Sequence, residues 1–233
     1  FDNWHKLNPD YKIIFFSFED AAYFLNVKFS NEYKNHFNKI TSAPHKCDFF
    51  RLCILYIYGG IYSDIDNIPL QPISEFINPH INIKFLSCLS NSKKSFAQAI
   101  IFSIKESYYI KVCIDRYINE FSKIINSKNY SGAPLSGTLI MHDEIKKIFI
   151  KNNYIKDNEL FLSHKEYAFS DRYISTNKQF RNTLLLLDEF TPDGKWWNCH
   201  MRNGYNTVLK CRYDDYPWFT DSIYKNNNYE TFF

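Results

Sequence analysis

Residues 45–67 read HKCDFFRLCILYIYGGIYSDIDN, and this stretch carries the clearest structural signals in the chain. Its first half has a helical period, because five apolar side chains recur on one face: Phe49, Leu52, Cys53, Tyr56 and Ile57. Pro44 is typical of a helix start, and the pair Gly59 and Gly60 predicts where the helix stops.

Asp48 and Arg51 are three residues apart on this predicted helix. They therefore share a second face and can reach one ligand together. The alternative is a surface ion pair between neighbouring turns, worth a few tenths of a kcal/mol.

Residues 61–66 are rich in β-branched and aromatic side chains and predict a short strand. Strand side chains alternate, so Tyr62, Asp64 and Asp66 would point the same way, with the two aspartate Cα atoms roughly 6.7 Å apart. Two such carboxylates repel by about 2 to 3 kcal/mol at an effective dielectric of about 20, so a cation is expected beside them. Mg²⁺ and Mn²⁺ prefer such oxygen ligands, although two exposed, ligand-free carboxylates are the alternative.

The chain has 233 residues, enough for one domain that buries roughly 70% of its unfolded surface. Its 28 Lys and Arg against 25 Asp and Glu give a net charge of only +3. Because no global field favours nucleic acid or an anionic membrane, we expect no nucleic-acid partner, and any anion site must be local.

The six cysteines contain no C-x-x-C pair: Cys47, Cys53, Cys88, Cys113, Cys199 and Cys211. Free, buried thiols are therefore expected. A disulfide between distant cysteines is the alternative. The compartment, cytoplasm or secretory-pathway lumen, is not decided by the cysteine pattern. No run of eighteen apolar residues predicts a transmembrane segment in this chain. The sequence begins with Phe1, so an anchor or signal upstream is left open.

The remaining patterns predict alternating strands and helices without repeats or linkers, so a single domain over residues 1–233 is expected. The end of a helix followed by a turn is predicted at 4–11. Helical segments are predicted at 19–26, 31–39, 73–77, 96–104, 108–125 and up to about 149 after a loop at 131–138. Strands are predicted at 12–18, 81–89, 160–162 and 184–188.

Residues 46–66 follow the pattern K-x-D-x-x-R-x-x-I-L-Y-x-Y-G-G-I-Y-x-D-x-D. This pattern resembles the DXD-containing sugar transferases, in particular the retaining, family 32-like group with the yeast-type α-mannosyltransferases and α-galactosyltransferases. The glucosylating domains of the large clostridial toxins are similar. The resemblance is specific, because it covers about twenty positions where a bare D-x-D occurs by chance.

This resemblance implies an α/β fold of GT-A type, a Rossmann-like mixed sheet flanked by helices. Residues 4–11 resemble the W-x-x-x-N-P-x-Y segment that follows the first strand in this family. That first strand, which carries part of the nucleotide-base pocket, is expected to be missing from this chain.

The resemblance also implies roles for residues of the central stretch. Asp66 would ligate Mn²⁺ or Mg²⁺ directly, and Asp64 would touch the ribose, the sugar or the metal shell. Asp48 would hold a ribose or sugar hydroxyl, and Arg51 would meet the sugar or the diphosphate. Tyr62 is either a further donor contact or one more core aromatic residue.

Two segments further along resemble the family more weakly. His200 lies in an H-x-x-x-G pattern that ends at Gly204, where the family completes the metal shell and closes over the donor. The Ser and Trp that follow in the family are absent here, and a lone His is often structural. Gly132 lies in a loop resembling the family's G-P-x-x-L turn with Ala133 inserted, which predicts either a donor contact or a helix cap.

We therefore expect a metal-dependent, retaining glycosyltransferase that moves a hexose from a UDP- or GDP-sugar to a hydroxyl of a glycan, lipid or protein acceptor. One alternative is a Mg²⁺ phosphohydrolase, which would need D-x-D-x-T/V, whereas residue 68 is Ile. The other is a non-catalytic sugar- or nucleotide-binding module.

Overall fold

The computed structural model describes residues 2–40, 43–77, 84–89, 96–124, 137–151, 184–190, 200–203 and 206–211. The helices in these ranges are α1 (Asp2–Leu7), α2 (Phe18–Lys28), α3 (Asn31–Lys39), α4 (Ala43–Tyr58), α5 (Ile73–Phe76), α6 (Tyr108–Ile124) and α7 (Gly137–Lys151). The strands are β1 (Gly60–Ser63), β2 (Asn67–Pro69), β3 (Phe85–Leu89), β4 (Phe96–Ser103), β5 (Leu184–Phe190), β6 (His200–Asn203) and β7 (Asn206–Cys211).

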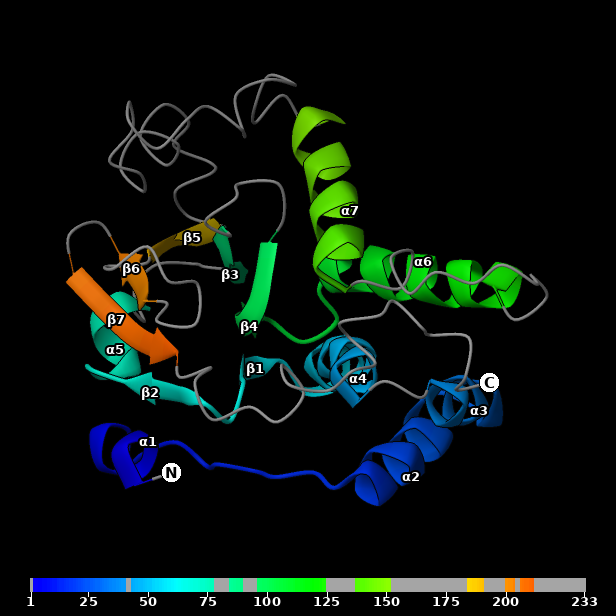
Figure 1. Cartoon of the computed structure of the whole chain (residues 1–233), viewed down its shortest axis with the longest axis horizontal. Coiled ribbons are helices and arrows are strands. Elements are labelled where there is room, and N and C mark those ends of the chain that lie inside the picture. The colour runs from blue at the N-terminus through cyan, green and yellow to red at the C-terminus, as the bar shows by residue number, and fades with distance from the viewer. Residues whose placement is uncertain are drawn as a thin grey trace, which may run out of the picture.

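The described strands form one mixed, seven-stranded sheet in the order β1-β4-β3-β5-β6-β7-β2. β3 and β5 run parallel, and the other neighbouring strands in this order run antiparallel. β1 and β2 follow each other in the chain, yet they stand at opposite ends of the strand order. The sheet therefore curls, and the short turn between β1 and β2 joins its two edges (Figure 1).

Helices cover the β1 and β4 end of the sheet, where α4 contacts β1 and β4, and α7 contacts β4 (Figure 1). α6 packs on α4 and α7, while α2 and α3 pack on each other and on α4. The core between these layers is aromatic and aliphatic, with fully buried side chains such as Phe49, Leu52, Phe85, Ile101 and Tyr117. The predicted α/β fold with a mixed sheet flanked by helices is confirmed.

The predicted central helix is confirmed as α4, which ends where the glycine pair begins. Gly59 and Gly60 have φ angles of +68° and +97°, a region that side chains disfavour. A Cβ at Gly59 would lie 2.6 Å from the backbone nitrogen of Lys105, so the glycine also allows a close approach of two chain segments.

The helix end predicted within 4–11 is confirmed as the end of α1. The helices predicted at 19–26, 31–39, 73–77 and 108–125 and after the loop at 131–138 are confirmed as α2, α3, α5, α6 and α7. The strands predicted at 81–89 and 184–188 are confirmed as β3 and β5 within the described residues. The described cysteines Cys47, Cys53, Cys88 and Cys113 are free thiols, as expected. Among the described helices, none combines the length and the apolar character that crossing a bilayer requires.

Three predictions about secondary structure are wrong. Residues 12–17 form no strand but an extended segment with exposed apolar side chains, because no strand of the described part pairs with them. Residues 96–104 form the strand β4 instead of a helix. The strand predicted at 61–66 ends at Ser63, so Asp64 and Asp66 lie in a turn and strand alternation does not apply to them.

The strand predicted at 160–162 and most of the loop at 131–138 lie outside the described residues. The single domain over residues 1–233 stays a prediction.

Candidate active site

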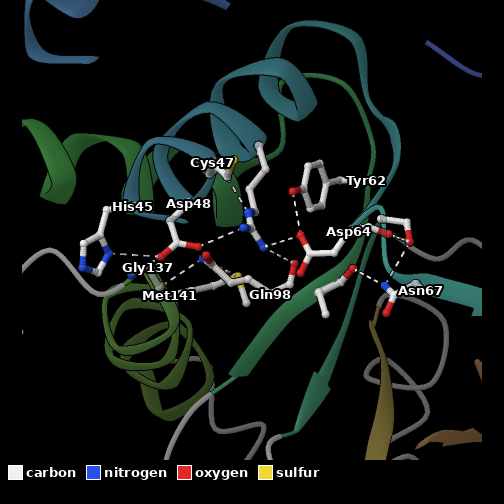
Figure 2. A network of polar contacts seen from close by, with 12 residues as sticks. His45, Cys47, Asp48, Tyr62, Asp64, Asn67, Gln98, Gly137 and Met141 are labelled. Carbon is white, nitrogen blue, oxygen red and sulfur yellow. Dashed lines mark hydrogen bonds and ion pairs between the residues drawn. The ribbon is translucent and has the colours of Figure 1, made fainter. Parts of the chain in front are cut away.

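The turn formed by Asp64, Ile65 and Asp66 is held against strand β4. The backbone N–H of Asn67 donates to the carbonyl of Asp64 at 3.2 Å and closes the turn. The carbonyl of Ala99 on β4 accepts two hydrogen bonds, from the backbone N–H of Asp64 at 2.8 Å and from the Asn67 side-chain amide at 2.7 Å (Figure 2). The carboxylate turn, as we call residues 64–66, is therefore fixed by the residue that follows it.

Asp64 is the partnered carboxylate of this turn. Its Oδ1 accepts a hydrogen bond from the Tyr62 hydroxyl at 2.7 Å and lies 3.4 Å from Nη1 of Arg51 (Figure 2). The Arg51 guanidinium also lies 4.5 Å from the centre of the Tyr62 ring. Burial raises the pKa of Asp64, and Arg51 and the Tyr62 hydroxyl oppose that rise. Tyr62 therefore contacts Asp64, although Asp64 lies in a turn and not on the strand face that alternation predicted for both residues.

Arg51 joins α4 to β4 and to the carboxylate turn through its guanidinium, although it lies almost fully buried in α4. Nε donates to the carbonyl of Cys47 at 3.1 Å, Nη1 to the carbonyl of Gln98 at 2.6 Å, and Nη2 lies 3.0 Å from Oδ1 of Asp48. Burial acts to lower the pKa of Arg51, but Asp64, Tyr62 and Asp48 outweigh it, so Arg51 stays charged. The alternative of a surface ion pair is wrong, because the Arg51 side chain is only 6% exposed.

Asp48 connects α4 to the amino-terminal end of α7. Its Oδ2 accepts the backbone N–H of Gly137 at 3.3 Å and lies 3.6 Å from Nδ1 of His45 (Figure 2). A negative charge at a helix amino terminus is favourable because the backbone N–H groups there point at it. Gly137 must be a glycine, because a Cβ would lie 2.7 Å from both Asp48 Cβ and the Tyr117 hydroxyl.

Asp66 is the carboxylate of the turn that has an unpartnered oxygen in the described part of the chain. Its Oδ1 is buried and has no hydrogen-bond partner among the described residues. Burial, and then the neighbouring Asp64 charge, raise the pKa of Asp66 to about 6. A buried carboxylate oxygen without a protein donor fits a divalent cation, which would neutralise both aspartates.

The described residues supply few further ligands for such an ion. Within the described ranges, no group of three or more His, Cys, Asp or Glu side chains is arranged so that it could hold a metal ion. Mg²⁺ and Mn²⁺ sites often use one or two carboxylates and take their other oxygens from water and substrate phosphates. Asp64 and Asp66 therefore fit a metal that is completed by a phosphate-bearing ligand.

His200 is placed by the register of three strands. It opens β6 and pairs with Lys210 of β7, which in turn pairs with Ile68 of β2. Two strand spacings amount to about 10 Å, so the His200 backbone lies near the strand that leaves the carboxylate turn. The His200 side chain, Gly132 and Gly204 lie outside the described part, and their predicted roles stay predictions.

Sequence reasoning missed Gln98, Asn67 and the contact between Gly137 and Asp48. The partners of Gln98 lie 39 and 47 residues away, so no local pattern points to them. A signal for Asn67 did exist, since Asp and Asn favour turns through hydrogen bonds to their own backbone, and the sequence here is Asp-Ile-Asp-Asn.

Residues 1–84 match the family model described as "Glycosyltransferase sugar-binding region containing DXD motif". This part of the chain is therefore similar to the DXD-containing glycosyltransferases. The DXD itself is the pair Asp64 and Asp66, so the family motif coincides with the carboxylate turn.

The DXD region also has relatives among known proteins. The chain is 31% identical over 77 residues to the initiation-specific alpha-1,6-mannosyltransferase of Candida albicans, covering 32% of this chain and 20% of that protein. It is 28% identical over 164 residues to an uncharacterized glycosyltransferase of Acanthamoeba polyphaga mimivirus, covering 68% of this chain and 61% of that protein. It therefore spans less than two thirds of the length of either relative.

One solved structure, the PaToxG glycosyltransferase, aligns with 77% of this chain and 76% of its own chain. The TM-score is 0.47 and the sequence identity is 18%.

Proposed function

We propose that this chain is a metal-dependent, retaining glycosyltransferase that transfers a hexose from a UDP- or GDP-sugar to an acceptor hydroxyl on a glycan, lipid or protein. The observation that carries the proposal is the carboxylate turn, in which the family's DXD pair combines a partnered Asp64 with a buried Asp66 oxygen that lacks a partner in the described part of the chain. The family match and the glycosyltransferase relatives support the reaction class.

In this proposal Asp66 is the direct ligand of Mn²⁺ or Mg²⁺, and Asp64 contributes to the metal shell or to the ribose of the donor. A divalent ion at this position would neutralise the diphosphate and stabilise the leaving nucleotide. Tyr62 orients Asp64 through its hydroxyl, as the 2.7 Å hydrogen bond indicates. His200, Gly132 and Gly204 are proposed to complete the metal shell and the donor site.

Arg51 and Asp48 are proposed to contribute to the donor site from its rim. Most of the Arg51 hydrogen-bond donors already serve Cys47, Gln98 and Asp48. Its remaining contribution is therefore the positive charge beside Asp64, which favours a donor diphosphate at short range.

The test is nucleotide release from a panel of UDP- and GDP-sugars with Mn²⁺, measured for the wild type, Asp66→Asn and Asp143→Asn. We expect the Asp66→Asn variant to lose at least about 100-fold in kcat/KM, since it removes a charge that holds the ion. Asp143→Asn is the matched control, because Asp143 lies 47% exposed on α7 and pairs with Arg116.

The outcomes separate the alternatives. Sugar-dependent nucleotide release that survives Asp143→Asn and fails in Asp66→Asn supports the transferase. Release of inorganic phosphate from simple phosphoesters, or binding of sugar nucleotide without any release, would overturn the proposal.

A further inference from the structure

Four residues of three elements form a closed ring of polar contacts beside the carboxylate turn. Asp48 accepts from Arg51 Nη2 at 3.0 Å and from the Gly137 backbone N–H at 3.3 Å. Gln98 donates from its side chain to the Gly137 carbonyl at 2.9 Å, and its own carbonyl accepts from Arg51 Nη1 at 2.6 Å. We call Asp48, Arg51, Gln98 and Gly137 the four-residue ring (Figure 2).

The ring connects α7 to the carboxylate turn through Arg51. The same Nη1 that donates to Gln98 lies 3.4 Å from Oδ1 of Asp64. The neighbouring residue of β4, Ala99, accepts the backbone N–H of Asp64 through its carbonyl. A shift of the carboxylate turn would therefore move both Arg51 and β4. Arg51 contacts Gln98, and β4 contains Gln98.

Gln98 is a poor choice for stability alone. Its side chain is 2% exposed, and its Oε1 has no hydrogen-bond partner among the described residues. A buried acceptor without a donor is unfavourable. The Gly137 carbonyl does not depend on Gln98, since the first carbonyl of a helix also accepts the intrahelical bond from four residues ahead. A methionine of similar shape would therefore fill the position at least as well.

We propose that the four-residue ring couples ligand binding at the carboxylate turn to the amino-terminal turn of α7, with Gln98 and Gly137 as positioning residues. This inference rests on the proposed function, because it takes the turn as the site where metal and nucleotide bind. The ring holds the first turn of α7 at a set distance from Asp64, and binding at the turn reduces the opening of residues 137–141.

The experiment uses the full chain with Mn²⁺ and UDP, and in a second series Mn²⁺ and GDP, so that no sugar is turned over. Amide hydrogen exchange at residues 137–141 is measured with and without the ligands, together with the dissociation constant of the nucleotide. Wild type, Gln98→Met and Met141→Leu are compared. Met141 is the matched control, because it is equally buried and contacts Gln98 Nε2 only through its sulfur at 3.7 Å.

We expect nucleotide with Mn²⁺ to slow exchange at residues 137–141 about tenfold in the wild type and in Met141→Leu. In Gln98→Met most of this slowing disappears and the nucleotide dissociation constant rises about tenfold, while the melting temperature stays equal or rises. A residue with a structural role only would instead lower the melting temperature and leave the ligand-dependent slowing intact.

Three results would overturn the inference. If the wild type binds Mn²⁺ and nucleotide without slower amide exchange at residues 137–141, the coupling is absent although the proposed function stands. This measurement uses the wild type alone, so it does not depend on whether a variant folds. The same holds if Gln98→Met keeps the full slowing. If the wild type binds neither UDP nor GDP with Mn²⁺, the proposed function fails and the inference fails with it.

Discussion

The two aspartates of the DXD pair differ in their surroundings, although only one residue separates them. Asp64 is held by Tyr62 and Arg51, whereas the buried oxygen of Asp66 has no partner in the described residues. Burial and the neighbouring Asp64 charge therefore make the ionised form of Asp66 unfavourable. The protonation of Asp66 should therefore differ between a turn that holds a metal ion and a turn that does not.

Asp66 should make the stability of the metal-free protein depend on pH. Its pKa is about 6 in the fold against 3.8 for an ordinary aspartate, so between these pH values the folded protein binds more protons than the unfolded chain. The free energy of unfolding should therefore fall as the pH rises from about 4 to about 6, by on the order of 1–3 kcal/mol. Urea unfolding at several pH values, with wild type and Asp66→Asn side by side, measures this.

The Asp66→Asn variant should lack this part of the pH dependence, while other titrating groups act equally in both proteins. Parallel curves for the two proteins between pH 4 and 7 would show that Asp66 does not titrate in this range. Added Mn²⁺ should stabilise the wild type more at pH 7 than at pH 5, because the ion binds the deprotonated carboxylate.

At the residue level, the sequence identified the members of the site better than their partners. Asp48, Arg51, Tyr62 and Asp64 lie together in the structure, and all four belong to the sequence pattern of residues 46–66. What Arg51 contacts beyond them could not be predicted, since Gln98 belongs to a strand 47 residues further along the chain.

At the level of elements, the join between α4 and β1 depends on two glycines in unlike surroundings. Gly59 has φ +68° and a Cβ would lie 2.6 Å from the Lys105 backbone nitrogen, whereas Gly60 has φ +97° and open space around it. Gly59→Ala should thus lower the free energy of unfolding by about 2 to 5 kcal/mol, from backbone strain and overlap together. Thermal unfolding of both alanine variants gives the comparison.

Gly60→Ala is the control for Gly59→Ala, because it carries backbone strain of about 1 to 3 kcal/mol without the overlap. Equal losses in the two variants would mean that the Lys105 segment moves aside. Such movement would contradict a close, fixed approach between this segment and the end of α4.

Elements with local signals were predictable, and those that depend on distant partners were not. α4 was predicted because its apolar period and its glycine stop lie within one stretch. β4 was taken for a helix because Phe96, Ile100 and Ile101 have the spacing of one helical face, whereas in the structure all three are buried in a strand. Residues 12–17 have strand-forming side chains, but a strand also needs a neighbour.

At the level of the whole molecule, the amino-terminal helix is tied to the strand that follows the DXD pair. The Trp4 indole N–H donates to the carbonyl of Asn67 at 2.9 Å, and α1 lies against β2. Trp4→Phe should therefore lower the free energy of unfolding by about 1 kcal/mol and speed amide exchange in α1. Chemical denaturation and hydrogen exchange measure the two effects.

His5→Ala serves as the control for Trp4→Phe, since His5 is exposed in the same helix. If both substitutions change stability and exchange equally, the indole hydrogen bond contributes nothing in solution. α1 would then be held by apolar packing alone.

The parallel pairing of β3 with β5 affects the order in which the sheet can form during synthesis. Phe85 pairs with Leu184, so the two central strands meet only after α6 and α7 have been synthesised between them. Such non-local pairing is slow, whereas β1 and β4 can pair without waiting for the later half. During synthesis on the ribosome, the DXD pair should therefore pack on β4 before β5, β6 and β7 have formed. A nascent chain stalled before residue 184 would present an incomplete sheet to chaperones, with the DXD pair already formed.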